Sequence, residues 1–243
     1  MGVFAGVNSW WMSTTDAGKN HAATRAVVQD SLLLNLDAAA SDSYSGSGNT
    51  WTDLSGQGNH GTINGATYTS AEEAFYFDGY NDRVECGDIT GFNTNKITLE
   101  AWVNVNSLTG NDGDTTGFII QGGGNSLDFG LAVSSSKFRF RTDGSHTTSI
   151  LSGTVSTDTW YHLLGTFDGS TMEFYLNNSS VGTVSSSITF LNSRNVELGR
   201  YPVASENAFQ LDGYLSVVRI YNDVLTTDEI EQNFNAYRER FGV

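Results

Sequence analysis

Residues 97–105 read Ile-Thr-Leu-Glu-Ala-Trp-Val-Asn-Val, and this stretch decides the fold class. Its apolar residues recur at every second position, which places them on one face of an extended chain: Ile97, Leu99, Ala101, Val103 and Val105. Thr98, Glu100 and Trp102 fall on the opposite face. Residues 97–105 are therefore predicted to form a core β-strand.

Strand patterns recur on both sides of this stretch at short intervals. They cover residues 32–37, 137–141, 160–167, 172–176, 196–199 and 214–221. Phe138 and Phe140 alternate with basic residues, which is typical of a sheet with one solvent-facing side. Asp168-Gly169 predicts a hairpin between 160–167 and 172–176, because glycine readily adopts the positive φ that tight turns require.

One helix is predicted, at the C-terminus. Thr226 followed by Glu229 is a capping-box pattern. An apolar stripe then recurs at helical spacing, made of Ile230, Phe234, Tyr237 and Phe241. Many short strands with a single helix exclude an alternating βαβ plan and predict an all-β antiparallel sandwich with one C-terminal helix.

The chain is predicted to divide into an N-terminal arm, residues 1–29, and one domain, residues 30–243. The arm is rich in Gly, Ser, Thr and Ala and shows no persistent period, but it carries the adjacent pair Trp10-Trp11. Two adjacent tryptophans point to opposite faces of an extended segment, so at least one needs an apolar partner outside the arm. Docking on another subunit and packing on the chain's own sandwich both remain open.

Composition and charge exclude several classes of protein. The 243 residues carry a formal charge of −15, which repels the phosphate backbone of nucleic acids. No stretch approaches the roughly 20 apolar residues of a membrane span, and the N-terminus lacks the basic start of a signal peptide. The one cysteine, Cys86, forms no intramolecular disulfide and is predicted to be a small buried residue.

Several short motifs stand in a recognisable order along the chain. They are Trp51-Thr52-Asp53-Leu54-Ser55-Gly56, Phe77-Asp78-Gly79-Tyr80, Thr98-Leu99-Glu100-Ala101-Trp102, Asp158-Thr159-Trp160-Tyr161-His162 and Leu211-Asp212-Gly213-Tyr214. Over roughly residues 31–235 this order resembles the laminin-G-like branch of the concanavalin-A-like lectin and glucanase superfamily. The resemblance implies a jelly-roll sandwich. The opening strand, the Trp51 loop and the closing helix are also similar to modules in virion proteins of tailed bacteriophages.

Catalysis is not predicted, and the chain is expected not to be an enzyme. Glycosidases of this superfamily place carboxylates at alternate positions of one strand, so that they flank the glycosidic bond. Glu100, Glu173 and Glu197 each stand alone on a predicted strand, where carboxylates are usually solvated. The four histidines show neither zinc spacing nor a nucleophile motif, and His162 is expected to hydrogen-bond within the sheet.

The glycine-rich loop from Asp53 to Gly61 is the one candidate metal site. Its glycines let backbone carbonyls converge with Asp and Asn oxygens, an environment that calcium accepts. An Asx turn that only binds its own backbone is the alternative. The resemblance implies a structural calcium held by this loop and the aspartate before the last core strand, and the predicted ligands are Asp53, Asn59, His60 and Asp212.

Candidate ligand-binding residues lie in or near predicted turns. Trp51, Tyr80 and Tyr201 could stack on sugar rings, and Asp112 and Asp114 lie in a long polar loop. The alternative is that these aromatic residues cover the ends of the sandwich.

The predicted function is a non-enzymatic structural or decoration protein of a tailed-bacteriophage virion, assembled in the host cytoplasm and displayed on the particle surface. Its arm would dock, through Trp10 and Trp11, to capsid or tail proteins or to copies of the same chain. Its sandwich would serve assembly and adhesion to host or other surface glycans. A carbohydrate-binding module for a cell-surface polysaccharide is the alternative, and a degenerate glucanase is a third, less favoured one.

Overall fold

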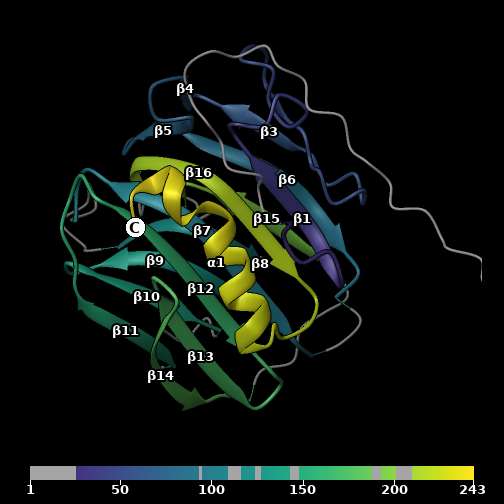
Figure 1. The fold of residues 1–243 in the computed structure, drawn as a ribbon, viewed down its shortest axis with the longest axis vertical. Coiled ribbons are helices and arrows are strands. Elements are labelled where there is room, and N and C mark those ends of the chain that lie inside the picture. The colour runs from purple at the N-terminus through teal and green to yellow at the C-terminus, as the bar shows by residue number, and fades with distance from the viewer. Residues whose placement is uncertain are drawn as a thin grey trace, which may run out of the picture.

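The computed structural model describes residues 26–92, 95–108, 116–123, 127–142, 148–187, 193–200 and 210–243. Within these ranges two antiparallel sheets, each with eight strands, pack face to face, and one helix lies across the outside of the first sheet (Figure 1). The arrangement confirms the predicted antiparallel sandwich with a C-terminal helix and agrees with a jelly roll.

The first sheet, sheet A, carries the helix on its outer face. Its path runs through β14 (Ser179–Ser185), β13 (Thr171–Leu176), β12 (Trp160–Phe167), β7 (Ile97–Val105), β16 (Asp212–Tyr221), β5 (Ala74–Asp78) and β4 (Thr67–Thr69), with β1 (Leu32–Asp37) pairing with β16. The hairpin predicted around Asp168-Gly169 joins β12 to β13, and Gly169 has the expected positive φ of 99°. Asn177 and Asn178 both adopt positive φ in the next turn, between β13 and β14.

The second sheet, sheet B, closes the other side of the sandwich. Its order is β11 (Ser149–Thr154), β10 (Lys137–Arg141), β9 (Leu127–Ser134), β8 (Thr116–Gly123), β15 (Ser193–Leu198), β6 (Arg83–Thr90), β3 (Gly61–Asn64) and β2 (Thr50–Trp51). Phe138 and Phe140 point into the core as their alternation predicted, but Arg141 on the other side of β10 is buried and not solvated.

The core lies between the two sheets and is built from the alternating apolar residues of both. Every residue of β7 is buried, because the sandwich covers its inner face and the helix covers its outer face. Cys86 belongs to this core as predicted, and burial raises the pKa of its thiol to about 12. The thiol is therefore protonated and enclosed at neutral pH.

Helix α1 (Thr227–Phe241) begins with the predicted capping box. The Thr226 hydroxyl accepts a hydrogen bond from the Glu229 N–H, and the Glu229 carboxylate accepts one from the Thr226 N–H. The apolar stripe of the helix packs on Trp102 and Val217, and the Trp102 and Phe241 rings stack with centroids 4.4 Å apart. Within the described part of the chain, no helix has the length and apolar character of a membrane span.

The packed domain begins earlier than residue 30. Val28 is only 7% exposed, its N–H donates to Asn233 of α1 at 2.9 Å, and its carbonyl accepts from the Tyr221 hydroxyl at 3.3 Å. Val28, which lies just before the predicted boundary at residues 29 and 30, therefore packs with the domain and completes a small apolar cluster beneath the start of α1.

Candidate functional site

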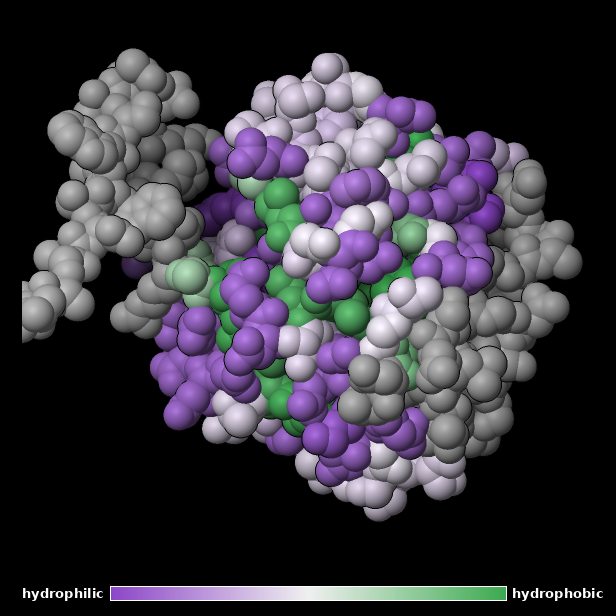
Figure 2. Space-filling model, turned by 90° about the vertical axis from the view of Figure 1, so that its right-hand side faces the viewer, coloured by the Kyte–Doolittle hydropathy of each residue, from purple (hydrophilic) through white to green (hydrophobic). Residues whose placement is uncertain are grey.

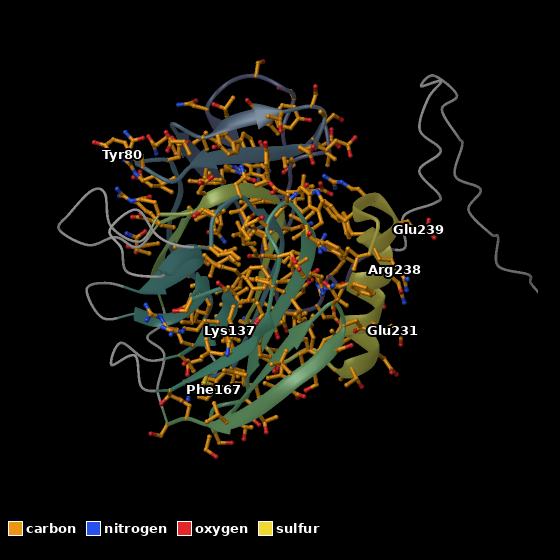
Figure 3. The ribbon with its side chains drawn as sticks, turned by 90° about the vertical axis from the view of Figure 1, so that its left-hand side faces the viewer. Tyr80, Lys137, Phe167, Glu231, Arg238 and Glu239 are labelled. Atoms are coloured by element: carbon orange, nitrogen blue, oxygen red, sulfur yellow. The ribbon has the colours of Figure 1, made fainter. Side chains whose placement is uncertain are left out.

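The aromatic residues predicted to bind ligand have different positions. Trp51 is wholly buried, with its ring centroid 4.6 Å from that of Phe75, so its prediction as a ligand-binding residue is wrong and it covers one end of the core. Tyr80 is 53% exposed, and Figure 3 shows it at the upper edge of the molecule, on the side away from α1. Trp10, Trp11, Asp112, Asp114 and Tyr201 lie outside the described residues.

The Asp53 carboxylate accepts four hydrogen bonds from neighbouring residues of the chain. Its Oδ1 accepts the N–H groups of Asn35 and Ser55, both at 2.9 Å. Its Oδ2 accepts the Ser55 hydroxyl at 2.7 Å and the Asn59 N–H at 3.0 Å. Calcium needs oxygens that are free to coordinate. The loop therefore forms the Asx turn that was left open as an alternative, and its carboxylate does not fit an ion.

The other predicted ligands do not complete a metal site with Asp53. His60 Nδ1 accepts the Asp53 N–H at 3.1 Å, and the Asn59 amide donates to the Leu33 carbonyl at 2.7 Å. Asn35, which bonds Asp53, pairs with Arg219 of β16, seven positions beyond Asp212. About 23 Å of strand separates these two positions, so Asp53 and Asp212 cannot share one ion. Among the described residues no group of three or more His, Cys, Asp or Glu could hold a metal.

Asp212 instead belongs to a surface that the strand register assembles on the outer face of sheet A. Trp160 of β12 lies opposite Asn104 of β7, Asn104 lies opposite Tyr214 of β16, and Tyr214 lies opposite Tyr76 of β5. A second row at the strand ends contains Asp212 opposite Asp78, with Asn106 beside them. We call these two rows the platform: Tyr76, Asp78, Asn104, Asn106, Trp160, Asp212 and Tyr214.

The platform continues the face that α1 covers, beyond the C-terminal end of the helix. Asn104 lies two positions after Trp102 and so on the same face of β7, while Trp160 contacts Phe241 with ring centroids 4.6 Å apart. The Tyr76 and Tyr214 rings pack at 5.1 Å with an interplanar angle of 44°. Trp160, Tyr214 and Tyr76 are each partly exposed. The helix end and this row thus frame a half-open aromatic surface.

The second row makes this surface acidic. Burial raises the pKa of Asp212, the hydrogen bond from Tyr76 lowers it, and the negative charges of Asp78 and Asp158 raise it further. The net result is a pKa above the ordinary value. Burial and the charge of Asp212 likewise raise the pKa of Tyr76.

Two oxygen acceptors in the platform have no hydrogen-bond partner among the described residues. Asn104 is only 9% exposed, and its Oδ1 is buried with no hydrogen bond to any described residue. The Oδ1 of Asp212 is likewise buried and has no hydrogen bond to any described residue. An unpaired buried acceptor costs free energy that a ligand's hydrogen-bond donor recovers.

Sequence reasoning missed Tyr76, Asn104, Trp160 and Tyr214 as binding residues. The usable signal was the alternation Phe75-Tyr76-Phe77-Asp78, which turns Tyr76 and Asp78 away from the core. What places these side chains in one row is the pairing of β12, β7, β16 and β5, which no local pattern reveals.

Glu100 was expected to be solvated, and that expectation is wrong. It is fully buried beneath α1, where it accepts hydrogen bonds from Arg219 and Asn233 at 2.8 Å each and lies 3.2 Å from His162 Nε2. Burial alone would raise the pKa of Glu100, but the Arg219 charge and the hydrogen bonds of His162 and Asn233 outweigh it and lower that pKa. His162 lies in the sheet as predicted. This enclosed cluster holds the helix to sheet A.

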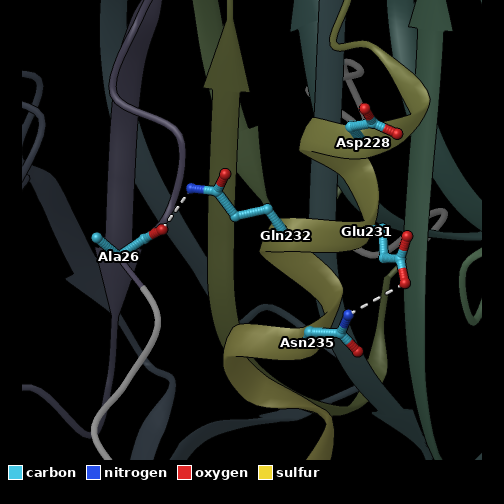
Figure 4. A pocket seen from close by; sticks show the side chains of 5 residues that line it. All are labelled: Ala26, Asp228, Glu231, Gln232 and Asn235. Carbon is cyan, nitrogen blue, oxygen red and sulfur yellow. Dashed lines mark hydrogen bonds between the residues drawn. The ribbon is translucent and has the colours of Figure 1, made fainter.

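A shallow hollow beside α1 is a weaker candidate site. Its volume is about 530 Å³, and it is lined by Ala26, Asp228, Glu231, Gln232 and Asn235 (Figure 4). Gln232 already donates to the Ala26 carbonyl at 2.6 Å, and none of the described residues that line the hollow is aromatic. On the face seen in Figure 2, small hydrophobic areas are separated by hydrophilic side chains. The described lining of the hollow therefore offers no ring-stacking surface like that of the platform.

A comparison with known protein families identifies the superfamily to which this fold belongs. A family model described as the concanavalin A-like lectin/glucanases superfamily matches residues 78–231. By sequence, no curated protein matches the chain.

Solved structures share the fold at low sequence identity. A mutant of Trypanosoma rangeli sialidase with trans-sialidase activity is 16% identical, with a TM-score of 0.67, over 90% of this chain and 35% of the sialidase. The binding domain of Paraclostridial Mosquitocidal Protein 1 is 17% identical, with a TM-score of 0.62, over 86% of this chain and 53% of that one. The chain thus spans about a third of the sialidase and about half of the binding domain.

Proposed function

Because the chain belongs to the concanavalin A-like lectin/glucanases superfamily, we propose that it is a non-enzymatic sugar-binding module and that the platform is its binding surface. The observation that carries this proposal is the row in which Trp160, Asn104 and Tyr214 lie directly opposite one another, extended by Tyr76. Sugar rings have an apolar face that packs on aromatic rings and hydroxyl groups that bond to neighbouring polar atoms. The platform supplies both, since unpartnered oxygens lie among its rings.

Tyr214→Ala is expected to weaken sugar binding about thirtyfold, because a well-packed aromatic anchor at an interface contributes about 2 kcal/mol. The measurement is affinity electrophoresis of the native protein and the variant through gels that contain soluble neutral or amino-sugar polysaccharides. Tyr80→Ala, run in parallel, tests whether the ligand also reaches the loop after β5.

Leu151→Ala is the matched control, because Leu151 is a large exposed side chain on sheet B, whereas the platform lies on the outer face of sheet A. Its mobility in the gels should equal that of the native protein. If polysaccharide gels retain the Tyr214→Ala and Trp160→Ala variants as strongly as the native protein, and all three have the same melting temperature, the platform is not the binding surface.

Hydrolysis is a second candidate function, because Asp78 and Asp212 lie directly opposite each other on neighbouring strands. Glycosidase carboxylates flank the bond from two sides. Here the two carboxylates come from neighbouring strands and not from alternate positions of one strand, as they do in the glycosidases of this superfamily. We expect no product from β-glucan, laminarin, agarose or peptidoglycan by reducing-end assay. Turnover that disappears in both Asp78→Asn and Asp212→Asn would identify a glycosidase.

The setting that we propose is the surface of a tailed-bacteriophage particle, with assembly in the host cytoplasm. Two observations support it: the resemblance of the opening and closing segments to virion modules, and the place where the chain enters the domain. Ala26 lies beside α1, on the outside of sheet A, with its carbonyl bonded to Gln232 (Figure 4). A docking segment that contains Trp10 and Trp11 would start from this side of the sandwich.

A further inference from the structure

Resting on the proposed function, we propose that the platform selects sugars with a free, protonated amino group, such as glucosamine oligomers, over their N-acetylated and anionic counterparts. The proposal names a chemical class of ligand and follows from the charge and hydrogen-bonding character of the platform.

Negative charge surrounds the aromatic row. Asp212 and Asp78 belong to the platform, the charge of Asp158 acts on Asp212, and Glu72 accepts a hydrogen bond from the Trp160 indole at 3.4 Å. None of the seven platform residues is basic. An anionic sugar would therefore meet four carboxylates, whereas an ammonium group would be attracted by them.

The guanidinium of Arg240, which lies 4.9 Å from the Phe241 ring centroid at the end of α1, is already engaged in ion pairs. Arg240 forms ion pairs with Asp37 at 2.8 Å and with Glu73 at 3.3 Å, and it also donates to the Ser216 hydroxyl. Its charge is therefore neutralised by these two carboxylates and is not available to receive an anionic ligand.

The two platform atoms without a described partner are hydrogen-bond acceptors, which favours a ligand that carries donors. Asn104 Oδ1 and Asp212 Oδ1 are acceptors, so a ligand must bring N–H or O–H groups to them. An ammonium group brings three donors and a positive charge, while an acetamide brings one N–H and added bulk. The faces of Trp160, Tyr214 and Tyr76 also attract a cation through their ring quadrupoles.

The row is long enough for an oligosaccharide. Three strand spacings separate Trp160 from Tyr76, which is about 14 Å across sheet A. Several ring contacts along this row favour oligomers over a single sugar, because each ring adds apolar contact without a new cost of association.

The test is calorimetric titration of the full chain with glucosamine hexamer and with N-acetylglucosamine hexamer, at low salt and slightly acidic pH. The two probes differ only in the acetyl groups. The glucosamine hexamer should bind about tenfold or more tightly, and Asp212→Asn or Asp78→Asn should remove most of that difference. Glu231→Gln, which removes one exposed carboxylate of α1, should leave the affinity unchanged.

The outcomes separate this inference from the proposed function. Equal binding of the two hexamers, abolished by Tyr214→Ala, would overturn amine selection and keep sugar binding. No binding of either hexamer or of the polysaccharides would overturn both. If calcium raises the melting temperature of the native protein but not of Asp212→Asn, and the glucosamine hexamer does not bind, the oxygens serve a metal and the inference is wrong.

Discussion

Arg219→Met is expected to lower the free energy of unfolding by about 3–5 kcal/mol, because it leaves Glu100 as a buried carboxylate without its guanidinium partner. Arg219 is fully buried, donates to Glu100 at 2.8 Å and donates to Asn35 of β1 at 3.0 Å. In a protein of this size the loss corresponds to a fall of about 10 °C or more in melting temperature. Thermal and urea unfolding of the purified variant measure it.

Arg238→Met is the matched control, because Arg238 is an exposed arginine in the last turn of α1. Its loss should change the free energy of unfolding by less than about 1 kcal/mol. The double variant Glu100→Leu with Arg219→Met should recover part of the stability, since it removes both buried charges together. If the Arg219→Met variant were as stable as the native protein, the Glu100 cluster would not be what holds α1 to sheet A.

Acid is expected to destabilise the protein through the buried cluster around Glu100. The pKa of Glu100 lies below its ordinary value of 4.5 in the folded protein, so its contribution to stability is present above that value. The contribution is lost as the pH falls through the lower, folded pKa. The native protein should therefore lose more stability in this acidic range than the double variant does.

Removal of residues 1–25 is expected to leave the melting temperature unchanged and to abolish incorporation into particles. The described domain begins with residues 26–29, so this truncation keeps Val28 in its cluster. A docking segment with two tryptophans contributes about 2 kcal/mol or more for each well-packed ring, which is enough to decide attachment. Mixing the truncated protein with particles that were assembled without it, followed by sedimentation, measures incorporation.

Removal of residues 1–29 is the informative comparison. It also deletes Val28 and leaves Asn233 and Tyr221 without their backbone partners, which should cost about 3 kcal/mol. A lower melting temperature for this protein than for the shorter truncation would confirm that Val28 belongs to the domain. Unchanged incorporation of the protein that lacks residues 1–25 would contradict the docking role of Trp10 and Trp11.

The elements of the fold could be predicted because local patterns carry them. The alternation in residues 97–105, the turn at Asp168-Gly169 and the capping box at Thr226 each use a short-range physical preference, and all three are present in the structure. The burial of Glu100 could not be predicted in this way. It depends on a helix that begins more than a hundred residues later and covers the outer face of β7.

Of the platform residues, only Asp212 was predicted from the sequence as a site residue, and it was predicted as a metal ligand. Its neighbours in the platform come from β5, β7 and β12, and their cross-strand register is set by the whole sheet. The Asp53 loop shows the opposite case. Its glycines, Asp and Asn suit either calcium or an Asx turn, and only the position of the Asn35, Ser55 and Asn59 donors decides between them.

The enclosed thiol of Cys86 makes the chain a convenient scaffold for chemical labelling. Thiol reagents attack the thiolate, and a protonated, buried group with a pKa of about 12 reacts very slowly with them under native conditions. A cysteine introduced at an exposed position, such as Ser180 on β14, would then be the reactive thiol of the folded protein without any need to replace Cys86. A fluorophore or a surface linker could be attached there at a single defined position.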